Sequence, residues 1–69
     1  MTRAADKLIA QITQEISSGV LRPGDQLEES VLAEKFGVSR TPIREAIRAM
    51  VGCGFLQTIP RQGATFRVL

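Results

Sequence analysis

Five arginines give the second half of this chain its distinctive chemistry. Residues 1–37 hold four basic and six acidic side chains, whereas residues 38–69 hold one acid, Glu45, against five bases. These bases are Arg40, Arg44, Arg48, Arg61 and Arg67. The planar guanidinium fork matches phosphates and the O6/N7 edge of guanine better than a lysine ammonium does. This half of the chain is therefore predicted to meet an anionic polymer.

Catalytic and metal-binding groups are scarce by comparison. The chain has no histidine and a single cysteine, Cys53, which excludes a Cys/His zinc site and an internal disulfide. No basic residue lies close to Cys53 in the sequence to activate it as a nucleophile, so we expect a half-buried apolar side chain there. The six glycines are dispersed as stops and turns rather than gathered in a phosphate-binding loop. We expect a protein that is not an enzyme and needs no metal or cofactor.

Helical segments in a single small domain are predicted to position the arginines. The first begins with Thr2 as N-cap and ends at Gly19. Its apolar face is expected to comprise Ala5, Ile9, Ile12 and Ile16, with Leu8 at the edge. A turn follows at residues 22–25, where proline and glycine take the two central positions. A second helix is predicted over about residues 28–36, ended by Gly37.

A third helix, over about residues 39–52, carries most of the arginines. Ser39, or alternatively Thr41, is expected to cap it, and Pro42 fits its first turn because the missing N–H would have no helical partner there. The predicted core stripe is Ile43, Ala46, Ile47, Met50 and Val51. Thr41, Glu45 and Arg48 then lie on the exposed side, with Arg44 at its flank and Arg40 at its beginning. A connection of about three residues to the second helix indicates a helix-turn-helix.

Two alternating segments after this helix predict a pair of strands at about residues 55–59 and 64–68. The loop between them, residues 60–63, forms a short hairpin with a basic tip that ends in glycine. Phe36, Phe55 and Phe66 all fall at positions of the core pattern.

Nearly the whole chain resembles the N-terminal domain of the GntR family of transcription regulators, in its FadR-like branch. The resemblance rests on Ile16 and Gly19 before Leu21-Arg22-Pro23-Gly24, on Leu27, Leu32 and Ala33, on the run from Phe36 through Ser39-Arg40-Thr41-Pro42-Ile43-Arg44-Glu45 to Ile47, and on Gly54, Gly63 and Phe66. The implied fold is α+β and mainly helical: a winged helix-turn-helix with three helices and a two-stranded β-hairpin wing. The implied function is sequence-specific binding of double-stranded DNA.

The resemblance also implies which residues bind DNA. The third helix enters the major groove, with base contacts from Arg40 and Arg44, while Ser39 and Thr41 lie nearer the phosphates and groove wall. The wing, over about residues 55–68, approaches the minor groove. The full set of expected DNA-binding residues is Ser39, Arg40, Thr41, Arg44, Arg48, Arg61, Gln62 and Gly63. Some relatives carry an operator-contacting arginine near the start of the second helix, where this chain has Glu28, Glu29 and Ser30. We expect that acidic pair to lie at the positive end of the helix dipole instead.

Residues 1–69 are thus expected to form one winged helix-turn-helix domain without the C-terminal effector and dimerisation domain of the family. That missing domain would bind a small-molecule effector and make the full-length protein a homodimer on a dyad-symmetric operator. No apolar run approaches the length of a membrane span, and we expect a cytoplasmic protein. The alternative is a winged helix that binds protein without DNA, because one fold serves both purposes. Exposed aromatic anchors would favour that alternative.

Overall fold

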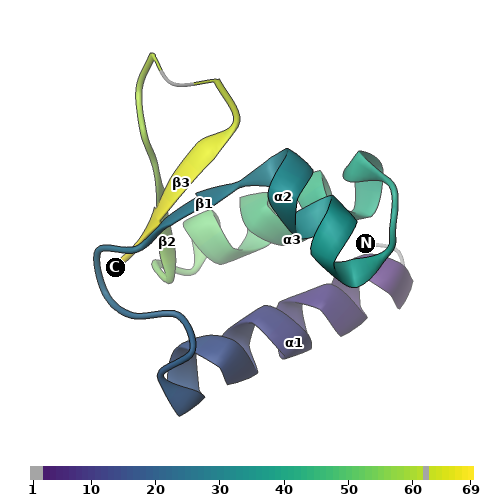
Figure 1. The fold of residues 1–69 in the computed structure, drawn as a ribbon, viewed down its shortest axis with the longest axis horizontal. Helices are drawn as coiled ribbons and strands as arrows, with labels where there is room; N and C mark the ends of the chain where they lie inside the picture. The colour runs from purple at the N-terminus through teal and green to yellow at the C-terminus, as the bar shows by residue number, and fades with distance from the viewer. Residues whose placement is uncertain (1–2, 62) are drawn as a thin grey trace.

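Three helices and a small sheet make up the fold in the computed structural model, which describes residues 3–61 and 63–69. Their order is α1 (Arg3–Ser18), β1 (Gln26–Glu28), α2 (Glu29–Phe36), α3 (Arg40–Gly52), β2 (Leu56–Thr58) and β3 (Thr65–Val68). Figure 1 shows α1 on one side of α3, with the β2–β3 hairpin rising on the other. The winged helix-turn-helix is confirmed, while Thr2, the expected first N-cap, lies outside the described residues.

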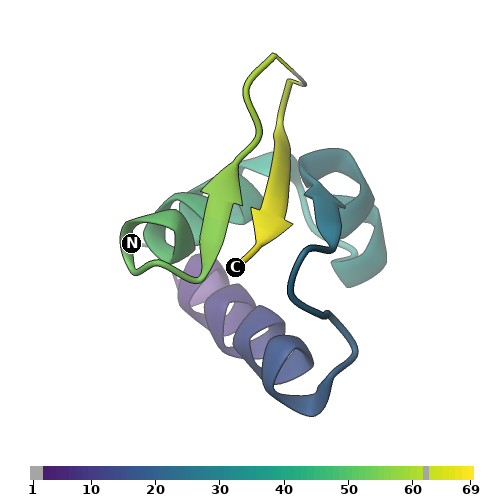
Figure 2. The same ribbon diagram turned by 90° about the vertical axis from the view of Figure 1, so that its left-hand side faces the viewer.

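The sheet has one more strand than the predicted two-stranded wing. Strand β3 lies between β1 and β2 and pairs antiparallel with both, as Figure 2 shows. The extra strand forms because the turn at residues 22–25 is tied to β3 by two backbone bonds. The Gly24 N–H donates to the Val68 carbonyl at 2.7 Å, and the Val68 N–H donates to the Asp25 carbonyl at 2.9 Å. Leu27 is thereby placed opposite Phe66 with its side chain buried.

The core lies where the three helices and the sheet meet. Its buried members are Leu8, Ile12, Leu27, Leu32, Ala33, Ile43, Ala46, Ile47, Met50, Leu56 and Val68. Leu8 is central to this cluster rather than at its edge, whereas Ile9 and Ile16 are only half-buried. The prediction of the apolar face of the first helix therefore gave too much weight to these two isoleucines and too little to Leu8. Removal of this apolar surface from water is the main stabilising contribution in so small a domain.

The turn between α2 and α3 sets the direction of α3. Gly37 follows α2 with φ of 67°, a left-handed conformation that glycine adopts without steric cost. The Val38 N–H then donates to the Ala33 carbonyl at 3.0 Å, and the half-buried Val38 side chain packs against the core. The predicted glycine stop is confirmed, and it turns the chain into α3 within three residues.

The segment after α3 departs from the predicted pattern. Phe55, expected in the core, is 45% exposed, and Leu56 is buried in its place at 1%. The cause is a tight closure of the helix end, because the Phe55 N–H donates to the Met50 carbonyl at 2.9 Å. This bond directs the phenylalanine outward and the next side chain inward. Cys53, expected to be half-buried, is exposed at the same helix end.

Candidate nucleic-acid interface

One side of α3 is buried in the core and the other carries the side chains predicted to bind DNA. The buried side consists of Ile43, Ala46, Ile47 and Met50. Arg40, Thr41, Arg44 and Arg48 are exposed, as is Ser39 just before the helix. The three arginines are spaced four residues apart, so they form one row along the exposed side. The separation into a buried face and a basic face follows the predicted pattern.

The beginning of α3 is defined by Ser39. This residue holds the N-cap position with extended backbone, φ −72° and ψ 170°, and α3 begins at Arg40. The alternative N-cap, Thr41, is therefore wrong. Among the residues that the structure describes, none in the helix donates a cap hydrogen bond to the Ser39 side chain. Ser39 is exposed, and its hydroxyl accepts no hydrogen bond from the described residues that would stabilise the helix end.

The wing projects past α3 (Figure 1), and the turn between its strands carries a further arginine, Arg61. Arg61 is exposed and has φ of 64°, the left-handed region that non-glycine residues seldom adopt. Gly63, also exposed, has φ of 61°. These two residues turn the chain so that the arginine lies on the hairpin loop and not along a strand. Gln62, the third predicted wing residue, lies outside the described residues.

The first residue of α2 contacts the basic row. The Arg44 Nη2 donates to Glu29 Oε1 at 3.0 Å, and the Arg44 Nε donates to Oε2 at 3.4 Å. The Glu29 side chain is only 4% exposed, whereas that of Arg44 is 54% exposed. The hydrogen bonds to Glu29, and secondarily its negative charge, raise the pKa of Arg44 above its ordinary value. Arg44 is thus a permanent cation with one edge of its guanidinium occupied by a buried carboxylate.

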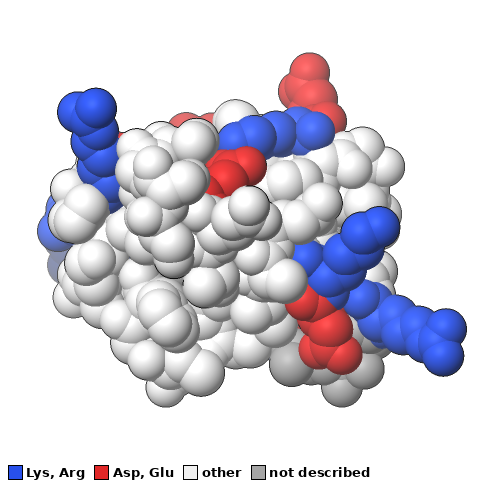
Figure 3. Space-filling view, turned by 90° about the horizontal axis from the view of Figure 1, so that it is seen from below, with Lys and Arg blue, Asp and Glu red and all other residues white. Residues whose placement is uncertain are grey.

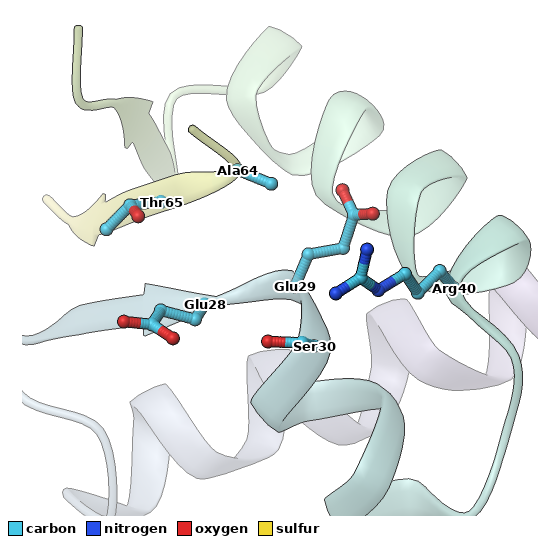
Figure 4. Close-up of a pocket in the computed structure, with 6 residues that line it drawn as sticks. All are labelled: Glu28, Glu29, Ser30, Arg40, Ala64 and Thr65. Carbon is cyan, nitrogen blue, oxygen red and sulfur yellow. The ribbon is translucent and has the colours of Figure 1, made fainter. Parts of the chain in front are cut away.

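A polar hollow of about 290 Å³ lies beside this pair, between the junction of β1 and α2, the start of α3 and the beginning of β3. Figure 4 shows its lining residues, which are Glu28, Glu29, Ser30, Arg40, Ala64 and Thr65. Arg40 extends from the start of α3 toward Glu29 but forms no ion pair with any residue in the described ranges. The two arginines predicted to contact bases therefore differ: Arg44 is held by a carboxylate and Arg40 is not.

The ion pair between Glu29 and Arg44 was not predicted from the sequence. Glu29 does lie in the first turn of α2, as the helix-dipole prediction required, but its side chain points inward to Arg44. A signal was present in the spacing: Glu29, Leu32, Ala33 and Phe36 recur at i, i+3, i+4 and i+7, which puts the acid on the apolar side of the helix. A charge on a buried face indicates a charged partner on the facing element.

The face opposite the wing differs from this basic row. Figure 3 shows that uncharged residues make up most of it, with charged side chains toward its margins. Lys35 of α2 pairs with Glu15 of α1 at 2.7 Å. Within residues 3–61 and 63–69, no cluster of acidic or cysteine side chains is placed to hold a metal ion. No helix in these ranges is both long and apolar enough to cross a membrane.

Bacterial transcription regulators are similar in sequence to this chain over most of its length. The profile of bacterial regulatory proteins, gntR family, matches residues 4–66. An uncharacterized HTH-type transcriptional regulator of Bacillus subtilis, YdhC, is 43% identical over 53 residues, covering 77% of this chain and 24% of that protein. The Escherichia coli repressor of a mannosyl-D-glycerate transport/metabolism system, MngR, is 43% identical over 54 residues, covering 77% and 22%. The chain thus spans about a quarter of the length of these relatives.

Solved structures share the fold as well. McbR/YncC of E. coli is 32% identical, with a TM-score of 0.87 over 99% of this chain and 31% of that chain. The AraR DNA-binding domain in complex with operator ORX1 is 32% identical, with a TM-score of 0.82 over 99% of this chain and 82% of that chain. A family profile that covers nearly the whole sequence and a shared winged-helix fold lead to one conclusion. This chain belongs to the gntR family of bacterial regulatory proteins.

Proposed function

We propose that this chain is the DNA-binding domain of a bacterial transcription regulator and binds double-stranded DNA sequence-specifically. The observation that carries the proposal is the row of exposed arginines on α3. This row lies in a fold that matches an operator-bound AraR domain over 99% of the chain. The major groove admits an α-helix, and the early part of a recognition helix is the part that reaches base edges. We therefore place α3 in the major groove and the hairpin of β2 and β3 near the minor groove.

The predicted site residues take distinct roles in this proposal. Arg44 and Arg40, in the first half of α3, contact base edges, because arginine pairs with guanine through two parallel hydrogen bonds. Phosphate and groove-wall contacts come from Ser39, Thr41 and Arg48, and wing contacts come from Arg61, Gln62 and Gly63. The exposure of every one of these residues within the described ranges supports this assignment.

At the level of the whole protein, we propose that residues 1–69 are one winged helix-turn-helix domain of a larger regulator. The larger protein acts as a homodimer on a dyad-symmetric operator, since a twofold dimer presents the same helix to each half-site. Its effector binds outside this domain. The domain is not an enzyme, and its DNA partner places it in the bacterial cytoplasm.

A second candidate function is a winged helix that binds a protein instead of DNA. The exposure of Phe55 favours it, because an exposed aromatic side chain is a typical anchor of protein interfaces. The two candidates differ in their response to salt. Binding of duplex DNA must weaken steeply as salt rises, because counterions are released from phosphates. A chain that fails to bind duplex DNA even at low salt would favour the protein-binding function.

The decisive experiment compares Arg44→Ala with Arg48→Ala. Duplexes with a randomised centre are selected on the parent chain, and all single substitutions of the selected site then compete for each variant. Arg44→Ala should lower discrimination at one base pair of the half-site by about tenfold to a hundredfold. Arg48→Ala should weaken binding to all sequences about equally, since a phosphate contact carries no base information. Unchanged base preference in Arg44→Ala would assign the reading to Arg40 or the wing.

A further inference from the structure

Glu29 connects α2 to the two elements that the proposed function brings to DNA, α3 and the wing. It begins α2, and its backbone N–H donates to the Ala64 carbonyl at 3.1 Å, just before β3 of the wing. Its carboxylate accepts two hydrogen bonds from Arg44 of α3. We infer that Glu29 is a positioning residue for base reading, which holds the Arg44 guanidinium so that its outer edge faces a guanine. This inference rests on the proposed function and adds a specificity-determining residue to it.

The donors of Arg44 are divided by this contact. A guanidinium has five N–H donors in one plane, and the bonds to Glu29 use the edge formed by Nε and Nη2. The adjacent end of the fork, formed by Nη1 and the second N–H of Nη2, still offers two parallel N–H groups. Guanine O6 and N7 accept such a parallel pair. Because two bonds to a nearly buried carboxylate fix the plane of the fork, Arg44 loses less conformational freedom when it binds a base.

The requirements of folding alone do not explain an acid at this position. Glu29 lies on the side of α2 that also buries Leu32 and Ala33, where an apolar residue of similar size would pack against the core. Replacing a buried ion pair with apolar side chains is often neutral or stabilising, since burial of a charge costs desolvation energy. The carboxylate is therefore better explained by what it does for Arg44 than by what it contributes to stability.

The charge of Glu29 should affect base discrimination and general affinity for DNA in opposite directions. A buried carboxylate beside Arg44 offsets the positive charge that would otherwise attract phosphates. Removal of Glu29 should consequently raise affinity for random duplexes and lower discrimination between bases. A residue that acts only through stability would lower both quantities together. These opposite signs distinguish a positioning role from a structural one.

The position of the guanidinium can be tested in the free 69-residue chain by nitrogen-15 relaxation of the arginine Nε–H groups. We expect the Arg44 Nε–H to be restrained on the picosecond-to-nanosecond timescale, and those of Arg40 and Arg48 to be mobile. In Glu29→Met, the Arg44 signal should become as mobile as that of Arg48. Equal mobility of Arg44 and Arg48 in the parent chain would overturn the inference, and this measurement requires no variant to fold.

The reading role is tested with Glu29→Met and the matched control Glu28→Met. Methionine resembles glutamate in length and offers no strong acceptor. Glu28 precedes Glu29, is exposed and lines the same hollow, so its substitution removes the same charge without touching Arg44. Both variants should gain about twofold in affinity for random duplexes at moderate salt. Only Glu29→Met should lose discrimination, by at least about fivefold, at the base pair read by Arg44.

The outcomes distinguish a failure of the inferred role of Glu29 from a failure of the proposed DNA-binding function. In an Arg44→Ala background, Glu29→Met should cause no further loss of base preference. Full discrimination in Glu29→Met, or an equal loss of affinity for selected and random duplexes, would overturn the role of Glu29 while DNA binding stood. A parent chain that binds no duplex would instead refute the proposed function, and the reading role with it.

Discussion

The salt dependence of DNA binding provides a quantitative test of the arginine row. Arg40, Arg48 and Arg61 are exposed and form no ion pair within the described part of the chain, whereas Arg44 is paired with Glu29. Each phosphate contact on duplex DNA contributes a slope of about −0.9 to a plot of log affinity against log salt concentration. On a duplex of mixed sequence Arg40 has no cognate guanine to read and contacts phosphate, as Arg48 and Arg61 do. Three contacts therefore predict a slope of about −2.7, equivalent to an affinity loss of about fortyfold between 50 and 200 mM salt.

Arg48→Ala is the perturbation that checks this count. Loss of one phosphate contact should reduce the slope to about −1.8, and the affinity loss over the same salt range to about twelvefold. Fluorescence anisotropy of a labelled duplex of mixed sequence measures both values. Lys35→Ala is the matched control, because it removes one positive charge that is already paired with Glu15 of α1. The control should keep the slope of the parent chain.

Three results would refute this reasoning. A slope near zero would exclude phosphate neutralisation as the source of affinity. A slope of about −3.6 or steeper would mean that a fourth cation, such as Arg44 or Arg67, also contacts phosphate, and would refute the count of three. An unchanged slope in Arg48→Ala would remove this residue from the interface.

Further substitutions test the core and the wing. Ile47→Ala, at a fully buried position, should destabilise the domain by about 2 to 5 kcal/mol, comparable to its whole free energy of unfolding, whereas Arg48→Ala should leave the melting temperature nearly unchanged by circular dichroism. Leu56→Ala should lower the midpoint of urea unfolding more than Phe55→Ala, although phenylalanine is larger, because only the leucine is buried; the reverse order would contradict the register of β2. Arg61→Ala should weaken binding to all duplexes by a similar factor without altering base preference, and competition among single-substituted sites would expose any base-specific effect.

Much of the fold could be predicted because its signals are local. The core stripe of α3 recurs with helical spacing, and glycines stand where helices end, so α3 and the turn before it followed from the order of residues alone. The concentration of arginines after Gly37 indicated an anionic partner without any coordinates. The exposed positions of Arg40 and Arg48 followed from the same stripe, because residues opposite a buried face must meet solvent.

Contacts between distant segments were decided only by the tertiary structure. The third strand forms because a turn near Gly24 meets β3, and such pairings depend on chain closure that no local pattern records. The register of Phe55 and Leu56 depends on one backbone bond at the end of α3. The pairing of Glu29 with Arg44 joins residues fifteen positions apart. Their sequence spacing showed that an acid lay on a buried face, but only the packing of α2 against α3 determined which cation it meets.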